Sequence, residues 1–331
     1  MMEPSTLALF WAGVIAAAIL IYVILDGFDI GVGILFGVTR DEAMRGQMMT
    51  SIAPFWDGNE TWLVVIGASL FAAFPAVYAV FLGAFYLPVL LMLFGLIFRG
   101  IAFEFRYRSV GMRRFWDGGF FYGSVLVAFV QGAAVGAMMR GIPVEGMQYA
   151  GGAFVWLHPF PVLTGIGLVL GYALLGAGWL VFRTEAALRD WAYSLIPGLV
   201  AMVFVVIGMA FIVSLTIDAG AIAQSNLKLR SWGLVFPILS LAALAGVLAG
   251  ARTKRDSLPF AMTVAFFLAA FLTLGVMFWP FMIPYALTIA DAASPDASLR
   301  FFFYGGIIVL PVIAAYTIGV YWVFRGKFER R

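Results

Sequence analysis

The stretch TLALFWAGVIAAAILIYVILDGFDIGVGILFG, residues 6–37, decides the fold. It is apolar over more than the about 20 residues that a helix needs to cross a hydrocarbon core. Its only charged side chains are Asp26 and Asp29. The run therefore predicts a membrane-spanning helix. Because charge is costly in hydrocarbon, the two acids mark a position with a functional or packing role.

The same composition continues along the chain of 331 residues, which is 64% hydrophobic and 11% charged. These values predict an all-α, polytopic membrane protein: one transmembrane domain over 1–331, with about nine helices in helical bundles. The expected spans are 6–37, 52–74, 77–105, 119–139, 160–183, 192–216, 231–250, 258–286 and 301–324. Residues 1–13 lack a basic stretch and a cleavage pattern, so we expect a retained first helix and not a signal peptide.

Basic residues define an orientation. Sixteen of the twenty Lys and Arg lie at one set of span ends, and the other side holds only Arg140, Lys228, Arg230 and Arg300. By the positive-inside rule the N-terminus is periplasmic and the C-terminus cytoplasmic. The bases are therefore interpreted as orientation signals and lipid contacts, and no nucleic-acid partner is expected.

Metal and heme chemistry are restricted by two residue counts. The chain has no Cys, which excludes disulfides and thiolate ligands, and it has one His, His158. A single imidazole cannot ligate a heme from both sides. We therefore expect no cofactor, metal or catalytic residue in this chain, and a hydrated loop position for His158.

Four carboxylates form the main candidate site. Asp26 and Asp29 share one helical face, because they are three residues apart. Asp57 and Glu60, in WDGNETW, repeat that spacing at the start of the second span. Since a short connection makes these spans antiparallel neighbours, we expect all four acids at similar depth, near the cytoplasmic face.

A cation is needed beside these acids, and Arg99 in the third span is the candidate. It has no acid three or four residues away, so it is expected to reach another helix, whereas Glu104 can pair locally with Arg108. One interpretation is a cytoplasmic proton entry through Asp26, Asp29, Asp57 and Glu60. The alternative is a static ion pair with helix capping by Asp57.

Several other residues shape the helices. Gln131 is expected to donate a hydrogen bond between helices. Pro280 and Pro284 are expected to kink or end the eighth span. Small residues that would let helices approach closely are Gly27, Gly31, Gly33, Gly165, Gly167 and Gly171. The tetrapeptide FWDG occurs at 55–58 and again at 115–118, a weak sign of duplication.

Several segments together resemble subunit II of the cytochrome bd-type ubiquinol oxidases. They are DGFDIGVGILF, PFWDGNETWLV, LFAAFPAVYA, FYLPVLLMLFGLIFRGIAFEFR, FWDGGFFYGS and PVIAAYTIGVYWVFRGK. The resemblance runs from about residue 10 to 327, and the lack of a long insertion is similar to the shorter, cyanide-insensitive branch. WPFMIP and SPDASL agree with a late family segment, although Tyr285 departs from its pattern.

The resemblance implies a membrane heterodimer in the bacterial cytoplasmic (inner) membrane. The partner, subunit I, would carry two b-type hemes, heme d and the ubiquinol site, and subunit II would carry no heme. The family's acidic proton-path positions match Asp26 and Asp57, while Glu60 stands where some members have an amide. Trp62 matches a Trp near an oxygen entrance. Lipids, quinone and a small accessory subunit are further partners of the complex.

The resemblance implies a non-heme subunit of an oxidoreductase that reduces O₂ to water, scaffolding subunit I and conducting protons. Two alternatives follow from the residues alone. A proton-coupled secondary transporter would use the same buried carboxylates, but with broken helices at mid-membrane. A structural or assembly subunit would conduct no ion.

Overall fold

Long helices dominate the structure, a computed structural model that describes residues 3–108, 111–215 and 231–327. The longer helices are α1 (Thr6–Val38), α3 (Trp56–Ala73), α4 (Pro75–Phe105), α5 (Arg113–Arg140), α6 (Pro159–Arg183), α7 (Ala186–Ser214), α9 (Val235–Arg252), α10 (Ser257–Phe278) and α12 (Asp296–Val323). The shorter helices are α2 (Glu42–Ile52), α11 (Ile289–Ala292), η1 (Val155–Leu157) and η2 (Ser231–Leu234). Two antiparallel hairpins pair β1 (Val144–Glu145) with β2 (Gln148–Tyr149) and β3 (Phe281–Ile283) with β4 (Leu287–Thr288).

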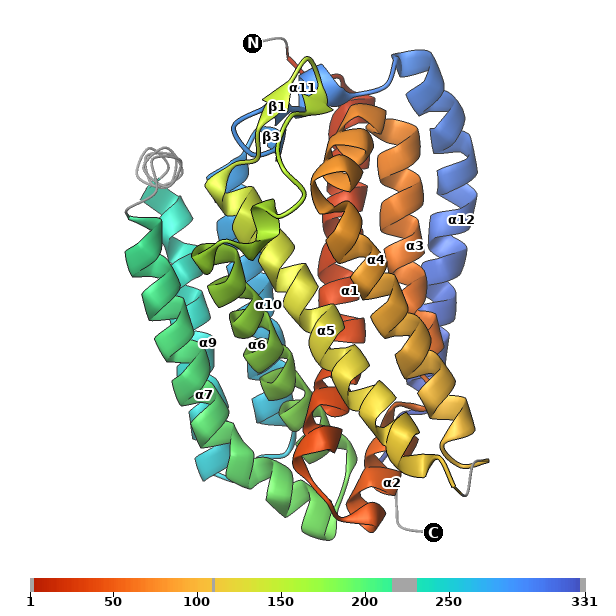
Figure 1. Cartoon of the computed structure of the whole chain (residues 1–331), viewed down its shortest axis with the longest axis vertical. Coiled ribbons are helices and arrows are strands. Elements are labelled where there is room, and N and C mark those ends of the chain that lie inside the picture. Colours follow the sequence, from red (N-terminus) through yellow and green to blue (C-terminus); the bar gives the residue numbers. More distant parts are fainter. Residues whose placement is uncertain (1–2, 109–110, 216–230, 328–331) are drawn as a thin grey trace.

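Eight of the nine longer helices that the structure describes form two groups of four. Figure 1 shows how they are arranged. One group contains α1, α3, α4 and α5, and the other contains α6, α7, α9 and α10. Helix α6 packs against both α1 and α5 and so joins the groups, while α12 lies along α3 and α1. Helix α1 is therefore central, and side chains in its C-terminal third are surrounded by protein.

Among the described residues, eight helices are long and apolar enough to cross a membrane, and they match eight of the nine expected spans. The remaining expected span, 52–74, forms α3, which is not among the eight. It has only 18 residues, and its first turns carry Asp57, Asn59 and Glu60, so it has no long apolar stretch like those of the other eight. Polar residues thus enter the bundle at the start of α3.

Some expected boundaries were wrong. The span expected at 258–286 ends at Phe278, where the chain turns into the β3–β4 hairpin. Pro280 and Pro284 lack the backbone N–H that would extend the helix. Helix α2 was expected to be a loop, and α5 begins at Arg113, earlier than the expected 119. Two features of the sequence lie outside the described residues. One is the last residue of the span expected at 192–216. The other is a set of four basic residues used for the orientation: Lys228, Arg230, Arg330 and Arg331.

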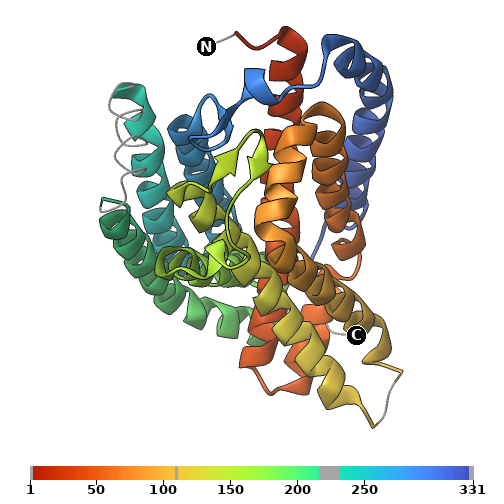
Figure 2. The ribbon, with the colours of Figure 1, turned by 45° about the horizontal axis from the view of Figure 1, so that its top comes forward.

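The two ends of the bundle differ in chemistry. The connections that carry most basic residues lie at the end where the chain's C-terminus is found, with α2 (Figure 1). The opposite end holds the N-terminus, both hairpins and α11, which Figure 2 brings forward. There Ser5 Oγ donates to Asp296 Oδ1 at 2.7 Å and Trp11 Nε1 donates to Leu299 O at 3.3 Å. These bonds fasten the start of the first long helix to the start of the last.

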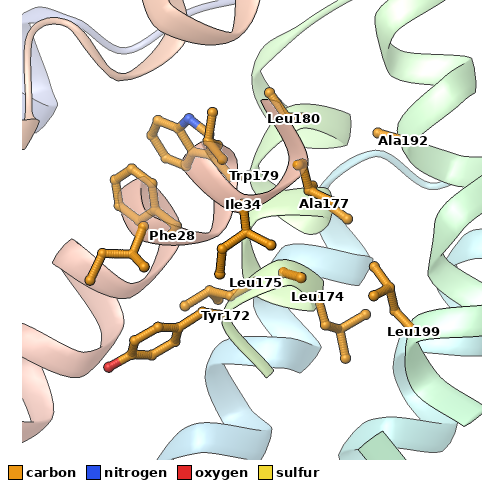
Figure 3. Close-up of a cluster of buried hydrophobic side chains, with 14 of the residues drawn as sticks. Phe28, Ile34, Tyr172, Leu174, Leu175, Ala177, Trp179, Leu180, Ala192 and Leu199 are labelled. Atoms are coloured by element: carbon orange, nitrogen blue, oxygen red, sulfur yellow. The ribbon is translucent and has the colours of Figure 1, made fainter. Parts of the chain in front are cut away.

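The core between the two groups is apolar and close-packed (Figure 3). Phe28 of α1 stacks on Trp179 of α6 with ring centroids 4.0 Å apart. Gly31 and Gly176 let the two backbones touch, because a β-carbon at Gly31 would lie 2.8 Å from the amide nitrogen of Gly176. This contact holds α1 firmly against α6 and fixes where its carboxylates point.

Candidate functional site

The two acids of α1 are sealed inside the protein. Asp26 and Asp29 are both 0% exposed, and every residue of α1 from Asp26 to Phe36 is buried. Asp26 lies about 30 Å along the helix from its first residue, at 1.5 Å of rise per residue. The acids are thus enclosed by neighbouring helices, and each needs a partner or a proton.

Arg99 supplies the positive charge from α4. Its guanidinium is 2% exposed, and Nη1 lies 3.5 Å from Asp26 Oδ1 and 3.2 Å from Glu60 Oε1. The arginine thus connects three helices, α1, α3 and α4. One cation faces two carboxylates in this cluster, with Asp29 one helical turn away on the same face of α1.

Several buried atoms of the cluster have no hydrogen-bond partner among the residues that the structure describes. They are both carboxylate oxygens of Asp26, Oδ1 of Asp29 and Nε of Arg99. Buried polar atoms are nearly always bonded, so such free positions are uncommon. The site has the capacity to bind a proton or water at atoms that the protein leaves open.

An amide from α3 contacts the second acid. Asn59 Nδ2 donates to Asp29 Oδ2 at 2.6 Å and to the carbonyl oxygen of Leu25 at 3.1 Å. The hydroxyl of Tyr321, near the end of α12, donates to Asn59 Oδ1 at 3.1 Å. Asn59 and Tyr321 extend the site to the last long helix.

A second chain of hydrogen bonds joins α6, α5 and α1. Tyr172 of α6 donates to Gln131 Oε1 at 2.9 Å, and Gln131 Nε2 donates to the hydroxyl of Tyr22 at 2.8 Å. Gln131 therefore bonds between helices as its position in the fourth span indicated. Tyr22 is one turn before Asp26 on α1, so this chain leads toward that carboxylate.

The structure separates other candidates from this cluster. Asp57 is exposed in the first turn of α3, where the N-cap has no side-chain hydrogen bond. Glu104 is exposed and pairs with Arg108 at 3.9 Å. Trp62 is buried, 7% exposed, and its indole N–H has no partner in the described ranges. Asp57 is thus outside the buried cluster, although it lies only about one helical turn from Glu60 along α3.

The helical periodicity of α3 explains why Asn59, and not Asp57, faces the neighbouring helices. The buried stripe of α3 consists of residues three or four apart: Asn59, Trp62, Val65, Ser69 and Ala73. Asp57 is two residues from Asn59 and so points to the opposite side of the helix. Asn59 lies three residues before the apolar Trp62, and this spacing in the sequence could have identified Asn59 as the inward-facing polar residue.

A separate ion-pair network closes the end of the bundle that holds α2. Arg106 donates to Asp117 Oδ1 at 2.5 Å and to Glu42 Oε2 at 2.7 Å, and Arg45 lies 3.1 Å from Asp117. Burial raises the pKa of Glu42, but the hydrogen bond and charge of Arg106, with Arg113, outweigh it and lower that pKa. The two FWDG copies therefore differ, since Asp117 is paired and Asp57 is exposed.

Metal ligands are not gathered anywhere in the parts of the chain that are described: no group of three His, Asp or Glu could hold an ion there. His158 is exposed, immediately before α6, at the end of the bundle that holds the N-terminus. Titratable chemistry is therefore centred on the Asp26–Arg99–Glu60 cluster and Asp29.

These features define the class: a multi-pass helical membrane protein with a buried carboxylate site. The family model for cytochrome bd terminal oxidase subunit II matches residues 7–324, and the chain belongs to this family. It is 31% identical to cytochrome bd-I ubiquinol oxidase subunit 2 of Escherichia coli K12, covering 100% of this chain and 97% of that protein. It is 29% identical to cytochrome bd ubiquinol oxidase subunit 2 of Bacillus subtilis 168, covering 97% and 96%.

The fold agrees with this membership. The structure of bd oxidase from Geobacillus thermodenitrificans matches with a TM-score of 0.76 and 16% identity, covering 97% of this chain and 100% of that one. At this identity the match concerns the fold alone. The named relatives are subunits of an oxidoreductase complex.

Proposed function

We propose that this chain is the non-heme subunit of a terminal quinol oxidase that reduces O₂ to water, in the bacterial cytoplasmic membrane. It would scaffold subunit I, which would carry two b-type hemes and heme d and oxidise ubiquinol, with lipid, quinone and a small accessory subunit as further partners. We further propose that residues 1–331 form one transmembrane domain with α3 as its ninth span, and that the N-terminus is periplasmic.

The specific role that we propose for this chain is proton conduction from the cytoplasm, which would make the complex a translocase. The observation that carries it is a pair of carboxylates, Asp26 and Asp29, wholly buried on α1. Asp26 pairs with Arg99 at 3.5 Å, and Oδ1 of Asp29 has no hydrogen-bond partner among the described residues. A carboxylate that only fixed packing would have that oxygen bonded. Arg99 keeps the local charge balanced when a carboxylate ionises.

Exposure suggests the order of the groups. Asp57 is exposed, and the Glu60 side chain is 26% exposed, whereas Asp26 is fully buried. A proton from the cytoplasm would therefore reach Asp57 and Glu60 before Asp26 and Asp29. Trp62 is buried on the same stripe of α3, and we propose it as part of an oxygen entrance. Glu104 remains a structural ion-pair residue.

Asp26→Asn tests the proposal, because it is nearly isosteric and removes the titratable group. Loss of a proton relay lowers turnover by about tenfold or more, at unchanged complex yield and heme spectrum. Asp190→Asn is the matched control, since Asp190 is exposed on α7 and should leave turnover unchanged. Full turnover in Asp26→Asn would refute the proton relay. A loss of complex yield alone would mean that Asp26 has only a structural role.

A further inference from the structure

Asn59 occupies the point where three helices meet. Its side chain is 1% exposed and makes hydrogen bonds to α1 through Asp29 and Leu25, and to α12 through Tyr321. A buried amide with all these bonds is held in one place. Removing it changes the surroundings of Asp29 without changing the number of carboxylates in the site.

The direction of the Asn59 amide follows from its neighbours. The carbonyl oxygen of Leu25 can only accept, and so the atom facing it at 3.1 Å must be the amide nitrogen. The same nitrogen donates to Asp29 Oδ2 at 2.6 Å. The amide oxygen then points to the hydroxyl of Tyr321, which donates to it. The bonds from Tyr321 to Asn59 and from Asn59 to Asp29 both run toward Asp29.

The two oxygens of Asp29 are consequently different. Oδ2 accepts the bond from Asn59, while Oδ1 has no partner within the described part of the protein. An amide side chain donates and accepts hydrogen bonds but does not take up a proton as a carboxylate does. The chain from Tyr321 through Asn59 therefore orients the carboxylate and does not itself carry protons.

We propose that Asn59 is a positioning residue for proton transfer, which holds Asp29 by Oδ2 so that Oδ1 is the atom that takes up and releases the proton. Tyr321 fixes Asn59 in turn. The Tyr321 ring is itself held, stacked on Phe55 with centroids 4.6 Å apart. The inference rests on the proposed proton conduction and adds the groups that set its geometry.

Three substitutions in the full complex test it. Asn59→Leu removes both donors and keeps the branched shape of the side chain, Asn59→Ala removes the whole amide, and Tyr321→Phe keeps the ring stack. Ser69→Ala is the control, because Ser69 is buried on the same stripe of α3, away from the acids. The readouts are turnover per heme, complex yield and the infrared band of the protonated Asp29 carboxyl, identified by its loss in Asp29→Asn.

We expect both Asn59 variants to lose turnover by about tenfold, the effect of one charge-assisted hydrogen bond, and to shift the carboxyl band. Tyr321→Phe should shift the band in the same direction, with a loss of about two- to threefold since it acts through Asn59. Ser69→Ala should match the unmodified complex in all three readouts. A static packing role would lower yield and leave the band in place.

The outcomes separate the two proposals. If Asp29→Asn is inactive while both Asn59 variants keep normal turnover and an unshifted band, the positioning role is wrong and proton conduction stands. If Asp29→Asn itself keeps full turnover, Asp29 lies outside the proton path. Proton conduction through Asp29 and its positioning by Asn59 are then both wrong. If the Asn59 variants do not assemble, an unshifted band in Tyr321→Phe overturns the inference.

Discussion

Gly31 of α1 and Gly176 of α6 pack backbone against backbone, so that neither position has room for a side chain. A β-carbon on Gly31 would lie 2.8 Å from the amide nitrogen of Gly176, and one on Gly176 would lie 2.9 Å from the α-carbon of Gly31. Both neighbours are main chain, which cannot rotate away. The contact sets the separation of the two helices, and through it the position of the carboxylates on α1.

Gly176→Ala should therefore destabilise the complex. Overpacking of this kind costs about 1–3 kcal/mol, and here it also pushes α1 and α6 apart. Gly13→Ala is the matched control, because Gly13 is also within a long helix but has nothing within 4 Å of the added carbon. Thermal unfolding in mild detergent should show a lower midpoint for Gly176→Ala only. Equal midpoints would show that the helices can move apart freely.

Arg99→Leu should damage assembly more than turnover per assembled complex. It leaves Asp26 buried without its cation, which costs about 3–5 kcal/mol. The control is Arg108→Leu, since Arg108 and its partner Glu104 are 77% and 60% exposed. Complex yield should fall strongly for Arg99→Leu and stay normal for Arg108→Leu. Adding Asp26→Asn to Arg99→Leu should restore part of the yield, and no recovery would contradict the pairing.

The network around Glu42 should make stability depend on pH. Arg106 and Arg113 lower the pKa of Glu42 below its usual 4.5, despite the opposing effect of burial. A lowered carboxyl pKa stabilises the folded state above the unfolded pKa, and this contribution is lost as pH falls through the folded value. The unfolding midpoint of Glu42→Gln should thus lie below that of the unmodified protein at neutral pH, and the difference should vanish in acid.

Glu145→Gln is the control for that comparison. Glu145 is exposed in β1 at the opposite end of the bundle, and no ion pair of it occurs in the described ranges. Its midpoint should follow the unmodified protein at every pH. A Glu42→Gln difference that persists unchanged in acid would mean that packing of α2, and not the charge of Glu42, carries the effect.

Single cysteines can test the orientation, because the chain has no Cys of its own. Arg114, in the first turn of α5, and Arg255, between α9 and α10, are exposed in the basic connections. Glu145 in β1 and Asp291 in α11 are exposed at the opposite end of the bundle. A membrane-impermeant thiol reagent added to intact cells should label cysteine at Glu145 and Asp291 only. Labelling at Arg114 from outside would reverse the proposed topology.

Hydropathy predicted most of the fold, because each span must be apolar over a fixed length. Hydropathy failed for segments that do not cross the membrane, since these need not be apolar over a fixed length. Helix α2 has mixed composition and is held by Asp41, whose carboxylate accepts from Ala43 N and Met44 N, a capping pattern that was overlooked. The end of α10 was set too late because the hairpin after Phe278 is as apolar as the helix before it.

The candidate site was less predictable. Spacing placed Asp26 and Asp29 together, and the isolation of Arg99 from local acids indicated a partner on another helix. The side of α3 that faces α1 depends on how that helix is rotated, which the spacing of Asp57 and Glu60 does not determine. Tyr321 is far from Asn59 in sequence, and only the packing of α12 against α3 brings them together.

The bonds from Ser5 to Asp296, from Trp11 to Leu299 and from Tyr321 to Asn59 have a consequence for how the protein is made. The ribosome delivers α1 first and α12 last, so the carboxylates enter the membrane long before the helix that completes their surroundings. A nascent chain that ended before α12 would hold Asp29 and Asn59 without Tyr321. The translation machinery must therefore finish nearly the whole polypeptide before the surroundings of Asp29 and Asn59 are complete.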